Sequence, residues 1–144
     1  MGIQGAGKST FYRERFADTH VRINLDMLRT RHREKTIFQA CLACDQHLVI
    51  DNTNPTAADR ARYIAPARVA GAEIIGFYFS SRVSDAMIRN AGRTAAKRVP
   101  DKAILGTAGR LELPSRAEGF AALYYVTCLD PTGFSVKEWE DEIY

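Results

Sequence analysis

The spacing of apolar residues along the chain switches repeatedly between the period of a strand and the period of a helix. Short apolar runs of strand length occur at 21–24, 47–51, 73–80 and 123–128. Helical spacing between and around these runs predicts helices at 7–17, 34–45, 56–70 and 82–91, a short helix from Pro100 and an acidic helix at 135–143. Strands that alternate with helices indicate βαβ units. We therefore predict a three-layer α/β domain with a mainly parallel sheet and helices on both faces.

The apolar residues also predict which surfaces are buried. The run at 47–51 has a continuous apolar centre, which is typical of a strand that is buried on both faces of a parallel sheet. The first predicted helix directs Phe11, Tyr12 and Phe16 toward the core. With 144 residues, no repeats and no low-complexity tract, the chain is predicted to be a single domain, 1–144.

The charged residues are unevenly distributed. The formal net charge is +3, but residues 82–102 hold six Lys or Arg against two acids, whereas residues 129–144 hold one Lys against five acids. The basic segment 82–102 is therefore the predicted anion-facing surface.

The three cysteines, together with the absence of a signal-like segment and of any long apolar run, favour a cytoplasmic protein that does not span a membrane. Cys41 and Cys44 form a C-x-x-C pair within a predicted helix, and Cys128 is distant in sequence. His47 does not complete the four ligands that structural zinc requires. We interpret the pair as small apolar residues on a buried helix face.

The first ten residues, MGIQGAGKST, contain the pattern G-x-x-x-x-G-K-[ST] of the Walker A motif, or P-loop. Its glycines allow backbone N–H groups to surround phosphate oxygens, and the following helix directs its positive end toward the anion. Lys8 would contact the β- and γ-phosphates, and Ser9 would ligate Mg²⁺. The residues expected to hold ATP are Gly2, Gly5, Gly7, Lys8, Ser9 and Thr10. The fold class is accordingly a P-loop NTPase fold.

A P-loop normally follows a strand, but only Met1 precedes Gly2 here. A parallel sheet without its central strand would expose backbone groups that its neighbours are expected to pair. We expect that the first strand is truncated, and that the full protein has an apolar run of about five residues before Gly2.

Polar residues follow two of the predicted strands. Asn24 and Asp26 come after 21–24, and Asp51, Thr53 and Asn54 come after 47–51. In an open parallel sheet these residues meet at the edge where ligands bind. Asp51 is either a magnesium carboxylate or part of a solvated turn. Asp26 is either a general base or a helix N-cap, and Asn24 would suit the N-cap equally well.

The segment RNAGRTAAKRVP is a candidate lid over the phosphates, at about 89–99. Arg89 and Arg93 lie four positions apart and would share a face of a continued helix. Lys97 and Arg98 follow after small residues. Such a lid brings guanidinium groups to the transferred phosphoryl group and excludes water. The alternative is a solvated, charged helix end.

The segments GIQGAGKST, INLDMLR, IDNTNP and RNAGR…KRVP occur in an order that resembles the 5′-kinase domain of polynucleotide kinases and their small bacterial P-loop kinase relatives. The resemblance extends from Gly2 to about Val126 and includes the closing AEGFAALYYV. It implies that Asp26 is the base that activates a 5′-hydroxyl and that Arg29 contacts a substrate phosphate. It also implies that Arg89 and Arg93 are lid arginines, with Arg89 among the ATP-binding residues and Arg93 at the transferred phosphate. The D-x-D-x-T motif of the family's phosphatase domain does not occur, so phosphatase activity is not inferred.

The leading hypothesis is an ATP- and Mg²⁺-dependent kinase that phosphorylates a hydroxyl, most concretely the 5′-hydroxyl of an RNA or DNA end. Its catalytic residues would be Lys8, Asp26 and Arg93, its metal residues Ser9 and Asp51, and its acceptor-binding residues Asn24, Arg29, Thr53 and Asn54. A net charge of +3 is modest for gripping a polyanion, so a kinase of a small metabolite or sugar nucleotide is the alternative. A non-catalytic ATP-binding module is the third. Neither a membrane nor a protein partner is inferred.

Overall fold

The computed structural model describes residues 1–140. The helices are α1 (Lys8–Arg15), α2 (Leu25–Leu28), α3 (Arg31–Ala43), α4 (Ala57–Val69), α5 (Val83–Ala91) and α6 (Asp101–Ala108), with short 3₁₀ turns η1 (Ala95–Lys97) and η2 (Arg116–Glu118). The strands are β1 (Val21–Ile23), β2 (Leu48–Ile50), β3 (Ile75–Phe79), β4 (Ala122–Cys128) and β5 (Phe134–Glu138). No helix of this part of the chain is long and apolar enough to cross a membrane.

Several helices begin where a side chain can accept a hydrogen bond from the first turn. Thr30 caps α3 by accepting from Arg33 N, and Thr56 caps α4 by accepting from Asp59 N. These bonds satisfy N–H groups that have no partner inside the helix, which is why the helices begin at these residues. The α3 helix consequently begins before the predicted Glu34, while α1, α4 and α5 lie within the predicted ranges.

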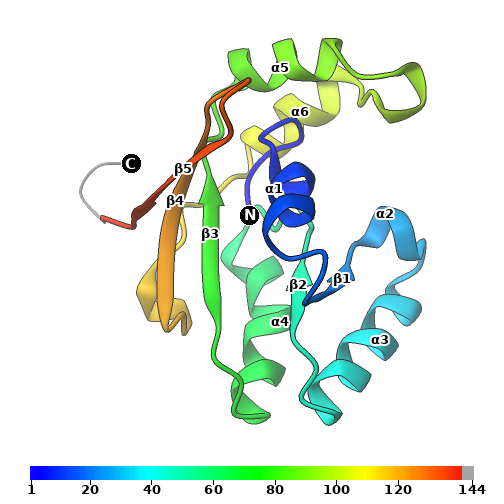
Figure 1. Cartoon of the computed structure of the whole chain (residues 1–144), viewed down its shortest axis with the longest axis vertical. Coiled ribbons are helices and arrows are strands. Elements are labelled where there is room, and N and C mark those ends of the chain that lie inside the picture. Colours follow the sequence, from blue (N-terminus) through cyan, green and yellow to red (C-terminus); the bar gives the residue numbers. More distant parts are fainter. Residues whose placement is uncertain (141–144) are drawn as a thin grey trace.

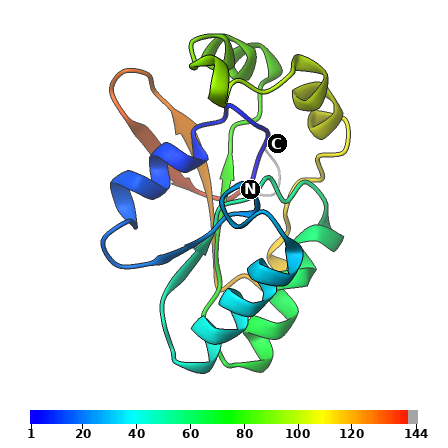
Figure 2. The same cartoon turned by 90° about the vertical axis from the view of Figure 1, so that its right-hand side faces the viewer.

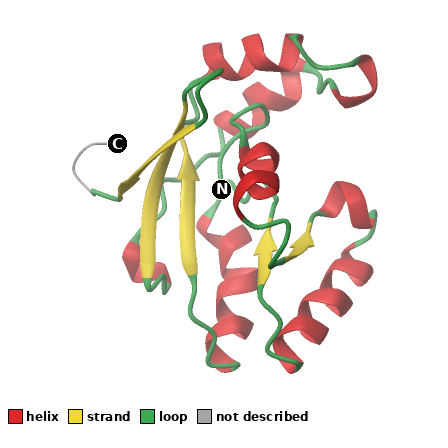
Figure 3. Ribbon diagram, in the orientation of Figure 1, coloured by secondary structure: helices red, strands yellow, loops and turns green. Residues whose placement is uncertain are grey.

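The strands form two sheets. In one, β1 and β2 are parallel, with Val21 opposite Leu48. In the other, β3 and β4 are parallel and β4 and β5 are antiparallel. Figure 1 shows β3, β4 and β5 on one side of the molecule and β1 and β2 on the other, with the N-terminus between them. The same separation is clear in Figure 3, where the strands are yellow.

Helices cover both faces of the strands, as predicted. Figure 2 shows α1 on one side and the pair α3 and α4 on the other. On the α1 side, Phe11 makes ring contacts with Phe77, Phe79 and Phe134 at centroid distances of 5.3, 5.3 and 5.1 Å. On the other side, Phe38 of α3 packs against residues of α4 and β2. These two apolar clusters define the three layers.

The helix predicted at 135–143 is wrong over its described part. Phe134–Glu138 is β5, with Val136 opposite Val126 of β4, and residues 141–144 lie outside the described residues. The turn Asp130–Gly133 reverses the chain, and Leu129 N donates to Gly133 O at 2.7 Å. Pairing with β4 satisfies the backbone of the segment and brings Phe134 against Phe11, which a helix here would not achieve.

The expected burial of the 47–51 strand is also wrong. Leu48, Val49 and Ile50 are all only partly buried. The reason is that β2 pairs with β1 alone and forms an edge of its sheet, rather than lying inside a continuous one. At the position where a strand ahead of the P-loop is expected, Met1 bonds to β3: Phe79 N donates to Met1 O at 2.9 Å.

Candidate active site

The loop Gly2–Gly7 forms a turn that requires glycine. Gly5 and Gly7 have φ of 80° and 99°, in the left-handed region. A Cβ on Gly5 would lie 2.6 Å from the backbone oxygen of Ala86, and a Cβ on Gly7 would lie 3.0 Å from the Phe134 ring. The first N–H groups of α1, like those of any helix, have no helical partner. Gly7 precedes α1 and provides no side-chain cap for them, so they suit a phosphate anion.

Lys8 folds back over this loop. Its Nζ donates to Gly2 O at 2.9 Å and to Ile3 O at 2.7 Å. Burial lowers the pKa of Lys8 from 10.5 to about 8, Asp51 opposes the shift and Arg93 adds to it. The ammonium is thus buried beside the loop that would hold phosphate, and it has carbonyl partners that an anion could replace.

Ser9, Arg22 and Asp51 form a charged triad at the start of α1. Ser9 Oγ donates to Asp51 Oδ2 at 2.9 Å, and Arg22 Nη2 donates to Asp51 Oδ2 at 2.6 Å and to Ser9 Oγ at 3.1 Å. The Asp51 side chain is 3% exposed and that of Arg22 is 28% exposed. Arg22 was not predicted. The only signal was its polar position between Val21 and Ile23 of an otherwise apolar strand.

The donor set fits magnesium. Ser9 Oγ and Asp51 Oδ2 are oxygen ligands, and Mg²⁺ in kinase sites is held by one or two such protein groups together with substrate phosphates. Within residues 1–140 there is no group of three or more His, Cys, Asp or Glu that could hold a metal ion. Cys41 is buried, whereas Cys44 is exposed, and neither forms a disulfide.

Asp26 lies in the first turn of α2, and Asn24 is the N-cap. Asn24 Oδ1 accepts a hydrogen bond from Met27 N at 3.0 Å, while its Nδ2 donates to Asp51 O. This geometry decides between the two alternatives for the cap. The Asp26 side chain is exposed and forms no hydrogen bond with the described residues. It is therefore free to meet a ligand.

A buried network holds α2 in place. Asn52 Oδ1 accepts from Leu25 N at 2.9 Å, and its Nδ2 donates to Glu34 Oε2 at 3.0 Å and to Tyr63 OH at 3.1 Å. The Tyr63 hydroxyl in turn donates to Glu34 Oε1 at 2.9 Å, and burial raises the pKa of Tyr63. Glu34 is 2% exposed. The network links α3 and α4 to the residue directly before Asp26.

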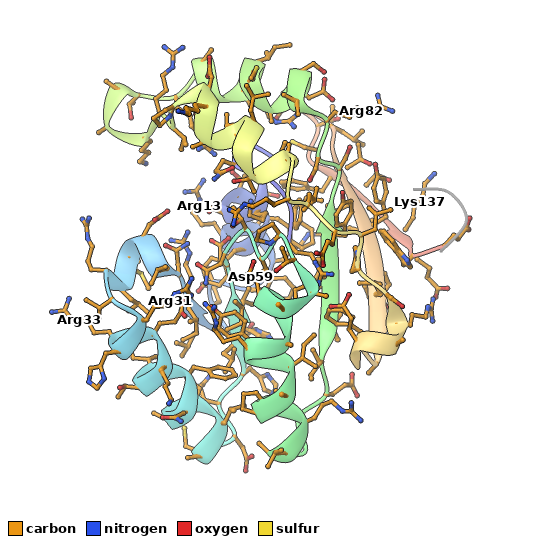
Figure 4. All side chains as sticks on the ribbon, turned by 180° about the vertical axis from the view of Figure 1, so that it is seen from behind. Arg13, Arg31, Arg33, Asp59, Arg82 and Lys137 are labelled. Atoms are coloured by element: carbon orange, nitrogen blue, oxygen red, sulfur yellow. The ribbon has the colours of Figure 1, made fainter. Side chains whose placement is uncertain are left out.

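One polar cavity of about 350 Å³ collects most of the predicted site. Of the predicted residues, it is lined by Gly5, Gly7, Lys8, Ser9, Asn24, Asp26, Asp51, Thr53, Asn54 and Arg93. Gly2, Thr10, Arg29 and Arg89 do not line it. The sequence did not predict the four other charged lining residues, Arg31, Asp59, Arg62 and Arg110. Figure 4 shows Arg31 and Asp59 near the amino ends of α3 and α4.

Comparison with known proteins identifies the family of the chain. The AAA domain family matches residues 1–114. The chain belongs to this AAA domain family. It is also similar to the bifunctional polynucleotide phosphatase/kinase of Schizosaccharomyces pombe, with 28% identity over 147 residues, which cover 98% of this chain and 34% of that protein. The chain therefore spans about a third of the length of that relative.

The family and the relative together support a kinase-type function and confirm the resemblance to polynucleotide kinases. The acceptor of the phosphoryl group is a separate question, which neither comparison addresses. The α/β fold with helices on both faces is the P-loop NTPase fold that the motif predicts.

The predicted lid of this AAA domain is a loop whose two ends are joined by hydrogen bonds. Asn90 is fully buried, its Nδ2 donates to Val99 O at 2.7 Å, and its Oδ1 accepts from Val99 N at 2.9 Å. Arg89 does not face the cavity, because its Nε donates to Gly5 O at 2.6 Å and its Nη1 lies 3.9 Å from Asp130. Arg93 does line the cavity. The two predicted lid arginines thus have different surroundings.

Proposed function

We propose that this chain is a kinase that transfers the γ-phosphoryl group of ATP to the 5′-hydroxyl of a nucleic-acid end. The observation that carries the proposal is that Lys8, Asp26, Asp51 and Arg93, which come from four separate segments, line one polar cavity. Phosphoryl transfer requires little covalent chemistry from the protein. It requires a phosphate cradle, a metal site, a group that orients the acceptor and a cation for the developing charge.

The phosphate half of the cavity is built on α1. The N–H groups at the start of α1 and the Lys8 ammonium would hold the β- and γ-phosphates. Ser9 and Asp51 would hold Mg²⁺, which would neutralise negative charge on the phosphates. Because Lys8 is buried, its attraction for a phosphate is screened little by water.

The acceptor half is built on α2 and on the lid. Asp26 would accept a hydrogen bond from the acceptor hydroxyl and take its proton as the new O–P bond forms. The bond between the γ-phosphorus and the bridging oxygen breaks, and ADP leaves. Arg93 would stabilise the charge that develops on the transferred group. Asn24, Thr53 and Asn54 would complete the walls on the acceptor side.

The nature of the cavity wall supports a phosphate-bearing acceptor. Arg31, Arg62 and Arg110 line the cavity with Arg93. Arg31 Nη1 forms an ion pair with Glu34 Oε1 at 2.8 Å. The side chains of Arg93 and Arg110, in contrast, form no hydrogen bond or ion pair with the described residues. Guanidinium groups in such positions suit the phosphates of a nucleic acid. Arg29 and Arg89 would act outside the cavity, Arg29 on more distant phosphates and Arg89 by bracing the P-loop.

A small hydroxyl compound or sugar nucleotide is the second candidate acceptor, favoured by the modest net charge of +3. Labelled ATP should be offered separately with 5′-hydroxyl RNA, 5′-hydroxyl DNA, the same oligonucleotides already carrying a 5′-phosphate, and a panel of metabolites and nucleotides. The proposal expects label on the 5′-hydroxyl oligonucleotides and none on the 5′-phosphorylated controls. Label confined to the metabolite panel would reject the nucleic-acid acceptor, and absence of label from every compound would reject the kinase.

A further inference from the structure

Arg22 binds both of the oxygen atoms that we assign to Mg²⁺. Its Nη2 donates to Asp51 Oδ2 at 2.6 Å and to Ser9 Oγ at 3.1 Å, and its Nε donates to the same Asp51 oxygen at 2.9 Å. Ser9 Oγ also donates to Asp51 Oδ2, at 2.9 Å. The guanidinium is therefore a cation that the protein itself supplies to the two candidate metal ligands.

The spacing of these two oxygens suits a metal ion. Mg²⁺ holds its octahedral ligands at about 2.1 Å, so neighbouring ligands lie about 3 Å apart. Ser9 Oγ and Asp51 Oδ2 are 2.9 Å apart, which matches two neighbouring ligand positions. A metal ion could therefore bind both oxygens with little movement of their side chains.

The Asp51 oxygen has no lone pair left for a further partner. A carboxylate oxygen has two lone pairs, and Oδ2 accepts three hydrogen bonds, two from Arg22 and one from Ser9. A metal ion binds through a lone pair, so it can use this oxygen only after Arg22 releases it. Metal binding at Oδ2 and the Arg22–Asp51 ion pair thus exclude each other.

The local charges also disfavour a metal ion that arrives alone. Arg22 already balances the charge of the Asp51 carboxylate, which is 3% exposed. Lys8 lies within electrostatic range of the same carboxylate, since burial lowers its pKa and Asp51 opposes the shift. A divalent ion would therefore be repelled by two positive groups in a site where water screens charges less than at the surface. The phosphates of a nucleotide would add the negative charge that such an ion needs.

Arg22 can move away from Asp51 without losing all of its partners. Its guanidinium carbon lies 5.6 Å from the centre of the Tyr12 ring, in a cation–π contact. The Tyr12 hydroxyl donates to His20 O at 2.8 Å, which holds the ring in place. Because the Arg22 side chain is 28% exposed, it can turn along this ring toward water.

We propose that Arg22 determines how the site selects its metal: it keeps divalent ions out of the Ser9–Asp51 site unless they arrive with nucleotide phosphates. The inference rests on the proposed function, because it concerns the metal of that same site. It names the group that links metal binding to nucleotide binding. As a consequence, the metal ion enters with the nucleotide and leaves with the product, and Arg22 returns to Asp51 between reactions.

The test measures the binding of Mn²⁺, which takes the same oxygen ligands as Mg²⁺, by electron paramagnetic resonance. Without nucleotide, Arg22→Met should bind Mn²⁺ at least about tenfold more tightly than the unmodified chain. At a Mn²⁺ concentration about tenfold above the Kd of the variant, its thermal midpoint should rise by roughly 4–6 °C. With a non-hydrolysable ATP analogue present, both proteins should bind Mn²⁺.

Matched variants make this result specific. Arg13→Met removes an exposed arginine of α1 (Figure 4) and should bind Mn²⁺ no better than the unmodified chain. Arg22→Lys keeps the positive charge and should keep Mn²⁺ out in the absence of nucleotide. Adding Asp51→Asn to Arg22→Met should remove the gained binding. If Arg22→Met does not fold, Arg22→Gln provides the same comparison, because it keeps a hydrogen-bond donor for Asp51 without the charge.

The unmodified chain allows a second measurement that needs no substitution. The exchange of the Arg22 Nε–H proton with water, followed by NMR, reports its hydrogen bond to Asp51. Mg²⁺ together with the ATP analogue should speed this exchange, because the ion pair opens. Neither Mg²⁺ alone nor the analogue alone should do so.

Equal binding of Mn²⁺ by the unmodified chain and by Arg22→Met without nucleotide, including no binding by either, would overturn the proposal. Gained binding that survives Asp51→Asn would also overturn it, as would slow exchange of Arg22 Nε–H in the presence of Mg²⁺ and the analogue. A chain that binds no nucleotide would reject the proposed function, whereas the comparison without nucleotide would still decide whether Arg22 excludes the metal ion. None of these readouts depends on kinase activity.

Discussion

The guanidinium of Arg22 donates two hydrogen bonds to one carboxylate oxygen of Asp51, at 2.6 Å from Nη2 and 2.9 Å from Nε. Arg22 lies on β1 and Asp51 directly follows β2, so the pair joins the two strands of one sheet. The same guanidinium also contacts Ser9. Its positive charge thus lies beside the two oxygen groups that we assign to magnesium.

Replacing Arg22 by methionine should therefore destabilise the protein in metal-free buffer. The change leaves the buried Asp51 carboxylate without its cationic partner, which costs about 3 kcal/mol, near the low end for buried pairs because Arg22 is partly exposed. Mg²⁺ with ATP should restore more of the lost stability than it adds to the unmodified chain. Urea unfolding measures both effects. Arg13→Met, at an exposed arginine of α1, is the control, and an equal effect of the two variants would show that the Arg22–Asp51 pair is not important for stability.

Asp26→Asn should lower kcat by about two to four powers of ten and leave ATP affinity and folding stability nearly unchanged. We expect kcat alone to change because Asp26 is exposed and forms no hydrogen bond with the described residues, so its charge would act only on the acceptor. Steady-state kinetics, ATP titration and thermal melting give the three readouts. Asp18→Asn, at another exposed aspartate, is the control. Unchanged turnover in Asp26→Asn would support a non-catalytic ATP-binding module.

ATP binding should weaken as the pH rises above about 8. The pKa of Lys8 is lowered to about 8 by burial, so the free protein loses the ammonium charge above this pH, and the Kd should rise by up to about tenfold per pH unit. The unfolded chain keeps this proton to about its ordinary pKa of 10.5, so the contribution of Lys8 to stability should increase with pH over the same window. Lys8→Arg keeps its positive charge, so its Kd for ATP should not rise with pH above about 8. A rise in Kd that persists in Lys8→Arg would show that another group titrates.

Asn90→Ala should release the lid loop. The change removes both hydrogen bonds to Val99 from a fully buried side chain, which should cost about 2–3 kcal/mol of stability. Arg93 lies within the loop that these bonds close, so kcat/KM should also fall, by about tenfold or more. Gln46→Ala, at an exposed amide, is the control for both measurements. A loss of stability without a loss of kcat/KM would indicate that Arg93 does not contribute to catalysis.

The elements that were predicted well are those with strong local signals. The helices α1, α3, α4 and α5 lie at or close to the ranges that helical spacing predicts, and α3 and α4 also begin at threonine caps, so local sequence suffices to locate them. The predicted helix is wrong over the described residues 135–140, because the acidic residues and mixed spacing suit a helix locally and only the facing edge of β4 makes β5 the better solution. Pairing between strands depends on residues that are distant in sequence.

The site shows the same division. The P-loop spacing predicted Lys8 and Ser9, and the polar residues that follow the strands predicted Asp26 and Asp51, and all four line one cavity. Arg22 and Asn52 were not predicted, because their importance comes from partners on other elements. Arg89 was predicted as a lid arginine that binds ATP, but its Nε donates to Gly5 O, since its direction depends on how α5 packs on the loop.

The sequence by itself therefore determined the phosphate-binding loop, the kinase resemblance and most of the helices, because each depends on residues within about one helical turn or on a fixed spacing. Only the tertiary structure decided that Arg22 neutralises Asp51 and that Asn24 rather than Asp26 caps α2. These features arise from groups that are far apart along the chain and meet only when the layers pack.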